Sequence, residues 1–176
     1  MPDVSIALPD PWIAVDMAEL AGDGLDALVD DAGPVRDLLA ATLANLAERQ
    51  VGFLALRVMA TEDGLVPTGL ITLILDRSDA TDLAEIEQRV RDELAEVSVR
   101  TLGSQEHVVG VTTDAAERSF VRGDFRLVDE GLMLTVWSTI TALDELAVEH
   151  EILDAIIGNL RLTGLNDDDR THRSRL

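Results

Sequence analysis

The chain has 176 residues, 47% of them hydrophobic, and a formal net charge of −20. That length is typical of one domain with a substantial core, and the hydrophobic fraction excludes disorder for most of the chain. So acidic a surface repels phosphate backbones and anionic lipid headgroups, so we expect neither nucleic acid nor membrane as a partner. The absence of cysteine excludes disulfides, thiolate zinc sites and cysteine nucleophiles.

The cellular compartment is predicted from what the sequence lacks. No apolar run approaches the roughly 20 residues of a membrane span. The start, Met1-Pro2-Asp3-Val4, has neither the basic nor the apolar region of a signal peptide. We therefore expect a cytoplasmic protein. All 14 basic residues are arginine, which suggests a genome rich in G and C.

The first third of the chain predicts two short strands and a helix. The strands are Val4–Leu8 and Trp12–Met17, broken at Pro9-Asp10-Pro11 because proline has no backbone donor for a ladder. Residues 18–32 are predicted to form a loop or a short helical turn. Gly33-Pro34 is typical of a helix start with proline at the first helical position, and helically spaced leucines follow it.

A hairpin and a second helix are predicted next. Phe53–Ala60 and Gly69–Leu75 are strand-like, and the second is apolar on both faces, which indicates a central strand covered on both sides. Thr81 or Asp82 is the expected helix cap. The apolar seam of this helix has helical spacing throughout and comprises Leu83, Ile86, Val90, Leu94 and Val97.

The last third gives the clearest pattern. Residues 106–113 and 118–128 are predicted to be extended, and Asp129-Glu130-Gly131 offers a glycine for a turn. In the predicted strand Leu132–Thr141, apolar residues alternate with a period of two, so that Leu134 and Val136 share one face. The helix Asp144–Leu160 should cover that face.

These elements predict an α+β fold, with an antiparallel β-sheet of about six to seven strands flanked by helices. Hairpins rather than parallel crossovers connect the strands. We expect one globular domain over residues 1–162. Residues 163–176 are polar and are predicted to be a disordered tail.

The order of elements resembles the PsbP/Mog-like family, which includes the extrinsic photosystem II subunit, a Ran-binding nuclear-import factor and many small actinobacterial proteins. The matching features are Leu8-Pro9 before Trp12, the strand Phe53–Ala60, the segment Leu83–Val97, Val109-Gly110-Val111, the run Gly131–Thr139 and the closing Ile152–Leu160. The resemblance implies an α/β/α sandwich and a binding or assembly role. Family members share no common active site, so it implies no functional residue.

Residues that could carry chemistry are few. His107 beside Glu106 is interpreted as a surface pair, His150 as a residue at the edge of the last helix's apolar seam, and His172 as part of the tail. The acidic stretch Asp23, Asp26, Asp30 and Asp31 lacks the spacing of a calcium loop. We therefore predict no catalytic, cofactor-binding or metal-ligating residue, and no cofactor.

Two tryptophans and one serine have structural interpretations. Trp12 and Trp137 supply much of the aromatic area, because the chain has no tyrosine. Each could line a ligand pocket, but packing in the core is favoured. Ser138 shares a strand face with Leu134 and Val136 and is expected to point into the core.

Three classes of function stay open. The leading hypothesis is a non-catalytic interaction or assembly module, an acidic adaptor or chaperone-like protein that docks a basic protein partner on its sheet or sheet edge. The alternative is a small-molecule or lipid carrier with a cavity between sheet and helix. The third class is an enzyme, whose active site would have to be assembled by folding from a pair of distant carboxylates or around His150. The sequence leaves a homodimer open.

Overall fold

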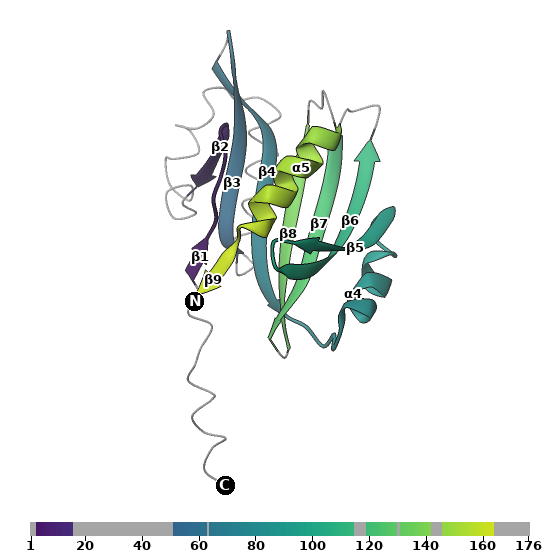
Figure 1. Cartoon of the computed structure of the whole chain (residues 1–176). Coiled ribbons are helices and arrows are strands. Elements are labelled where there is room, and N and C mark those ends of the chain that lie inside the picture. The colour runs from purple at the N-terminus through teal and green to yellow at the C-terminus, as the bar shows by residue number, and fades with distance from the viewer. Residues whose placement is uncertain are drawn as a thin grey trace.

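A seven-stranded antiparallel sheet organises the described part of the chain. The computed structural model describes residues 3–15, 51–62, 64–114, 119–129, 131–141 and 146–163. Seven strands follow one another in the order β2-β3-β4-β8-β7-β6-β5, and all neighbours are antiparallel (Figure 1). The seven-stranded antiparallel sheet with its helices confirms the predicted α+β fold class.

The bounds of the elements match most of the predicted ranges. The main sheet comprises β2 (Trp12–Val15), β3 (Val51–Thr61), β4 (Gly64–Arg77), β5 (Glu96–Leu102), β6 (Gln105–Asp114), β7 (Ser119–Asp129) and β8 (Leu132–Ile140). The helices among the described residues are α4 (Leu83–Val90) and α5 (Leu146–Gly158). A separate two-stranded sheet joins β1 (Asp3–Ser5) to β9 (Arg161–Thr163).

The two helices cover opposite faces of the sheet. Leu134 and Val136 of β8 pack with Leu153, Ile156 and Ile157 of α5. Met133 and Trp137, which alternate with them on β8, pack instead with residues of α4. This alternation along one strand confirms the period of two and gives three layers, with α4 confined to the β5–β7 end. No helix in the described part of the chain is long and apolar enough to span a membrane.

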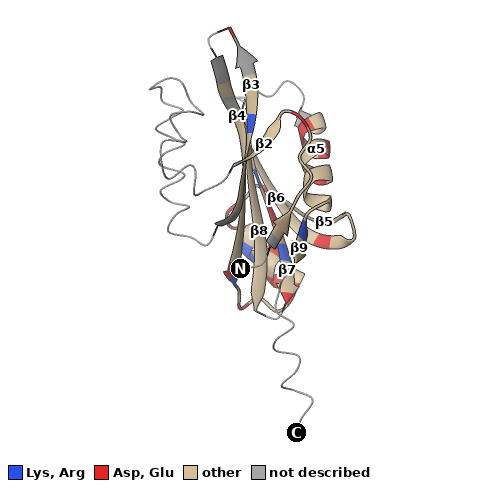
Figure 2. Ribbon diagram, turned by 90° about the vertical axis from the view of Figure 1, so that its left-hand side faces the viewer, with Lys and Arg blue, Asp and Glu red and all other residues tan. Residues whose placement is uncertain are grey.

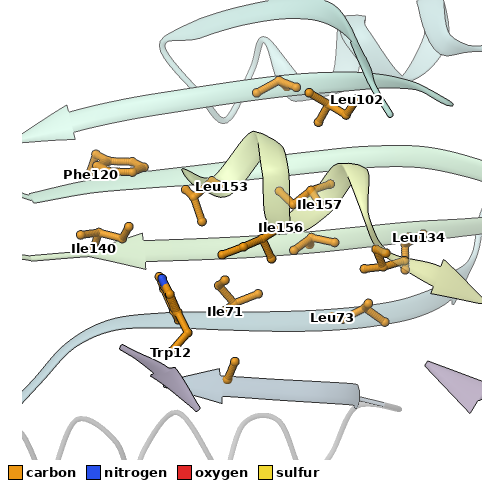
Figure 3. Packing of buried hydrophobic residues seen from close by; sticks show 14 residues of the cluster. Trp12, Ile71, Leu73, Leu102, Phe120, Leu134, Ile140, Leu153, Ile156 and Ile157 are labelled. Atoms are coloured by element: carbon orange, nitrogen blue, oxygen red, sulfur yellow. The ribbon is translucent and has the colours of Figure 1, made fainter. Parts of the chain in front are cut away.

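The main core lies between α5 and the sheet. Figure 3 shows Leu153, Ile156 and Ile157 of α5 directed at strand residues that include Ile71, Leu134 and Phe120. As predicted, β4 is buried on both faces: Ile71 and Leu73 belong to this core, and Ile74 is buried on the opposite face. Burial of so much aliphatic area on one helix face is the main stabilising contribution to the fold.

Trp12 belongs to this core, as its interpretation predicted. Its indole lies over Gly69 of β4, where an added Cβ would approach the Trp12 ring to 2.9 Å. Because Gly69 has no side chain, the indole ring of Trp12 from the edge strand β2 can pack directly on the backbone of β4. Trp137 is partly buried and packs edge-to-face on Phe125, with ring centroids 5.4 Å apart.

The helix predicted from the seam Leu83–Val97 is too long. Asp82 caps α4 by accepting a hydrogen bond from Glu85 N at 3.0 Å, but α4 ends at Val90. Val97 belongs to strand β5, which the sequence analysis missed. Leu94 and Val97 pack with the residues of α4 although they lie beyond its end, so their helical spacing does not reflect a helix. The alternating β-branched residues of Glu96–Leu102 favour a strand, and pairing with β6 completes it.

Other predictions differ at the edges or lie outside the described residues. β9 was not predicted, and its last residue, Thr163, which the sequence assigns to the tail, pairs with Asp3. The predicted helix after Gly33-Pro34, the loop at 18–32 and the rest of the tail fall outside the described residues.

Leu134→Ala should lower the free energy of unfolding by about 2–5 kcal/mol, and Val136→Ala by somewhat less, because both side chains are fully buried under α5. Thr135→Ala should cost less, since it deletes little apolar volume. Met59→Ala is a matched control, because Met59 is 49% exposed on β3. Urea titrations measure all four, and equal losses at Leu134 and Met59 would contradict this packing.

Candidate functional site

A buried ion pair lies on the α5 face of β7. Arg122 and Asp124 alternate in phase with Phe120, so all three side chains point toward α5. Both charged side chains are fully buried, at 0% exposure. Charged groups are seldom this buried unless they are paired and hydrogen-bonded, and the geometry here supplies both conditions.

The guanidinium of Arg122 is held from three sides. Its Nε donates to Asp124 Oδ2 at 2.9 Å and its Nη2 to Asp124 Oδ1 at 2.7 Å, which makes a bidentate pair. Nη2 also lies 2.6 Å from Asp154 Oδ1 of α5, and Nη1 donates to the carbonyl of His150 at 3.3 Å. β7 and α5 are therefore joined by an ion network inside the apolar core.

Asp154 extends this network to the surface. Its Oδ2 lies 2.6 Å from Nη2 of Arg100, an exposed residue of the edge strand β5. One carboxylate therefore bridges a buried arginine and an exposed one. Through it, β5, β7 and α5 are held in a single arrangement.

Burial and the charge of the partner shift the pKa values of Arg122 and Asp124 in opposite directions. Burial raises the pKa of Asp124 to about 6, against the opposing effect of the Arg122 guanidinium. Burial alone would lower the pKa of Arg122, but the carboxylates of Asp124 and Asp154 outweigh it and raise that pKa. Arg122 thus keeps its proton, and Asp124 is the member of the pair that acidification would neutralise.

An open hollow of about 600 Å³ lies above the network, between β5 and α5. Val109 and Val111 of β6 form an apolar floor. The rim carries the carboxylates of Glu96, Glu151 and Asp154, against the single arginine Arg100. Figure 2 shows acidic residues along α5 and on β5, on the same side of the molecule. The hollow is therefore acidic, with an apolar base.

His150 lines this hollow, which agrees with its predicted position at the boundary of the helix seam. Its ring lies 4.8 Å from that of Phe120, measured between centroids. Burial, followed by the positive charge of Arg122, lowers the pKa of His150, so the imidazole is neutral at pH 7. Folding thus brings His150 near Asp154, whose carboxylate is bound to the guanidinium groups of Arg122 and Arg100.

The interpretation of His107 as a surface residue is wrong. It is 1% exposed, on the same face of β6 as Val109, and neither ring nitrogen has a hydrogen-bond partner. Burial, together with the nearby charges of Arg126 and Arg122, lowers the pKa of His107 to about 4. The residue is a neutral core histidine. Ser138 is buried in the core as predicted, and its hydroxyl also lacks a partner.

The acidic stretch Asp23, Asp26, Asp30 and Asp31 lies outside the described residues, as does His172. Within the described part of the chain, no group of three or more His, Asp or Glu side chains is arranged to hold a metal ion. The charged side chains gather instead in the network and in the rim of the hollow.

Comparison with known proteins gives similarity of fold only. No protein-family model matches the sequence, and no curated protein matches it significantly. A solved structure from Bacteroides thetaiotaomicron VPI-5482 is similar with a TM-score of 0.50 at 10% identity, and the match covers 92% of this chain. This chain spans 46% of the length of that protein. The likeness shows the fold alone.

A second solved structure is LpqN of Mycobacterium tuberculosis, described as involved in cell envelope biogenesis. It is 14% identical, with a TM-score of 0.49, and the match covers 93% of this chain and 85% of that one.

The ion network was not predicted, although the sequence carries a signal for it. In the predicted strand 118–128, Arg122 and Asp124 occur in phase with Phe120, on the apolar side of the alternation. Opposite charges two residues apart on the buried face of a strand indicate a buried pair. The same phase argument with Val109 would have placed His107 in the core. The contribution of Asp154 depends on how α5 lies on the sheet.

Arg122→Met should lower the free energy of unfolding by about 3–5 kcal/mol, because it leaves Asp124 buried without a partner. The double variant Arg122→Met/Asp124→Leu should recover most of this loss, since Asp154 keeps Arg100. Chemical denaturation of wild type, both single variants and the double variant tests the pairing. A double variant as unstable as the sum of the singles would contradict it.

Acidification should destabilise the wild type relative to His107→Leu. The pKa of His107 is about 4 in the folded protein and 6.5 in the unfolded chain, so as the pH falls the unfolded chain is protonated at a higher pH than the folded protein. The stability due to His107 is present above pH 6.5 and is lost as pH falls toward 4, by roughly 3 kcal/mol.

Asp124 acts in the opposite direction, because its raised pKa stabilises the fold as pH falls through about 6. That contribution is common to wild type and His107→Leu, and it cancels in their difference. Unfolding free energies measured from pH 7 to pH 4 give the two curves. Parallel curves would show that His107 is protonated without cost.

Proposed function

We propose that the protein is a non-catalytic interaction module that docks a basic, extended segment of a partner protein at the hollow between β5 and α5. The observation that carries the proposal is the acidic rim of Glu96, Glu151 and Asp154 around an apolar floor, beside an edge strand. The cytoplasm is the compartment that we propose for this activity.

The edge strand supports this mode of binding. β5 is last in the sheet order, and its only neighbour among the described strands is β6. Most of its side chains are exposed, and Val99 is 45% exposed. An unpaired strand edge offers backbone donors and acceptors to an added strand, while adjacent pockets select its side chains. An extended segment is therefore the partner shape that fits.

Charge favours a basic segment. The exposed acidic residues around β5 include Asp92, Glu93, Glu96, Glu106 and Glu151, and the whole chain carries −20. Arg100 lies among them but is occupied by Asp154 at 2.6 Å. A partner with Lys or Arg side chains would gain from this potential chiefly in its association rate.

The ion network supplies a rigid support for the site. Arg100, Asp154 and Arg122 connect the edge strand, the covering helix and the central sheet. Because Asp154 of α5 binds both Arg100 of β5 and Arg122 of β7, the two walls of the hollow keep their separation before a partner arrives. Preorganisation of this kind reduces the ordering cost of binding.

The resemblance to the PsbP/Mog-like family, whose members serve mainly as binding or assembly factors, also favours an interaction module. The alternative, a small-molecule or lipid carrier, would place its ligand between sheet and helix. In the described residues, the main core and the Arg122 network occupy that space. No specific observation there favours the carrier.

Replacing two rim carboxylates should slow binding by at least tenfold at low salt. The test variant is Glu96→Arg/Glu151→Arg, and the matched control is Glu62→Arg/Asp76→Arg, which changes the net charge equally at exposed residues away from the hollow. The partner is the protein that co-purifies from the native host, and surface-based kinetics measure association at low and high salt. The rim variant should lose most of the salt dependence, because the Debye length is only about 8 Å at physiological ionic strength.

Two results would overturn the proposal. One is a salt-independent association rate of the wild type. The other is an equal effect of the two double variants, which would make the −20 a general solubility feature rather than a local docking surface.

A further inference from the structure

A second pocket has the opposite charge. It measures about 310 Å³ and lies where the β5–β6 turn, β7 and β9 meet. Its polar lining comprises Arg126, Arg161, Ser104 and Gln105, and its apolar lining comprises Leu127, Val128, Leu160 and Leu162. None of its lining residues carries a carboxylate, which is unusual in a chain with 34 acidic residues.

The two arginines differ from the other described arginines. Five described arginines contact a carboxylate: Arg57, Arg89, Arg91, Arg100 and Arg122. Among the described residues, neither Arg126 nor Arg161 has a carboxylate partner, and Nε of Arg126 is buried without any hydrogen bond. Arg161 donates through Nη1 only to the carbonyls of Gly158 and Leu160, at 3.1 and 3.0 Å.

The two guanidiniums also disfavour each other. The pKa of Arg126 is lowered by burial and by the charge of Arg161, so two like charges face the same small space. Arg77 also lacks a described carboxylate partner, but it is an exposed residue at the end of β4. Two cations in one pocket, neither with a carboxylate partner in the described part of the chain, form an arrangement that an anion would stabilise.

The pocket walls are held by a close backbone contact. Gly103 in the β5–β6 turn has φ +62, and a Cβ there would approach the carbonyl oxygen of Gly158 to 2.4 Å. A Cβ on Gly158 would in turn lie 3.0 Å from Gly103 N. Only two glycines permit this approach, which fixes the turn bearing Ser104 against the end of α5 and the start of β9.

We propose that Arg126 and Arg161 form a binding site for the oxyanion group of a small anionic ligand, with Ser104 and Gln105 as additional donors. The arginine forks match the geometry of phosphate and carboxylate oxygens. Two cations favour a group with two negative charges. Leu127, Leu160 and Leu162 provide an apolar surface for a short organic body, and a volume of about 310 Å³ is at the lower end of small-ligand sites.

This site does not depend on the acidic hollow. It is lined by no residue of the hollow and selects the opposite charge. A failure of the docking proposal would therefore leave the anion site intact, and the reverse also holds.

Inorganic phosphate and succinate are suitable probes, because they distinguish a phosphate source of the oxyanion from a carboxylate source. Isothermal titration and thermal melts should detect binding to the full chain of at least one probe, beyond the effect of sodium chloride at equal ionic strength. Arg126→Gln and Arg161→Gln should each weaken that binding by tenfold or more, whereas Arg77→Gln should bind like wild type. Without ligand, Arg126→Gln should melt no earlier than wild type, because it removes a like-charge repulsion rather than a structural contact.

Three outcomes would overturn the proposal. The first is that neither probe has an effect on the wild type beyond that of sodium chloride. The second is that binding persists unchanged in Arg126→Gln and Arg161→Gln. The third is that binding is detected only after deletion of residues 165–176, which would assign the pocket to the carboxylates of Asp167-Asp168-Asp169 instead of an external ligand. Equal binding by the full and truncated chains supports an external ligand.

Discussion

The position of α5 on the sheet depends on one buried guanidinium. Arg122 lies at full burial in the middle of an aliphatic face, where a charge without partners would be prohibitively unfavourable. Asp124 supplies the neutralising charge from the same strand, but the remaining donors must be met from above. Only α5 in its observed placement presents Asp154 and the carbonyl of His150 to them. Hydrophobic packing alone would tolerate small shifts of the helix, whereas this set of directional bonds does not.

The parts of the structure that could be predicted from the sequence are those that depend on local patterns. Alternation in Leu132–Thr141 predicted strand β8, its buried face and its covering helix, because one strand face and one helix stripe are local properties. The order of strands and the pairing of β1 with β9 depend on contacts between distant segments, and no local pattern encodes them. Strand β5 was not predicted, because five apolar residues that span the end of α4, the following turn and the start of β5 happen to have helical spacing.

The candidate sites were harder to predict than the fold. The alternation of each strand places His107, Arg122 and Asp124 on its buried face. Polar and charged residues are usually exposed, however, so their residue types favoured a surface position. Arg126 and Arg161 are separated by 35 positions and meet only through the sheet and the β9 return. A chain of net charge −20 thereby keeps a local cationic pocket and an acidic hollow on separate sets of residues. Net charge describes the sum of these surfaces and neither of them alone.

The pairing of β1 with β9 has a mechanical consequence. Asp3 lies opposite Thr163, and Ser5 lies opposite Arg161, so the described chain begins and ends at the same rung of one ladder (Figure 1). Tension applied between these two ends would open that ladder one rung at a time, as a zipper opens, instead of shearing all its hydrogen bonds together. The ribbon would therefore yield at low force and spare the seven-stranded sheet. The same adjacency would let a short peptide join Asp3 to Thr163 in a circularly permuted chain with new ends at a surface turn.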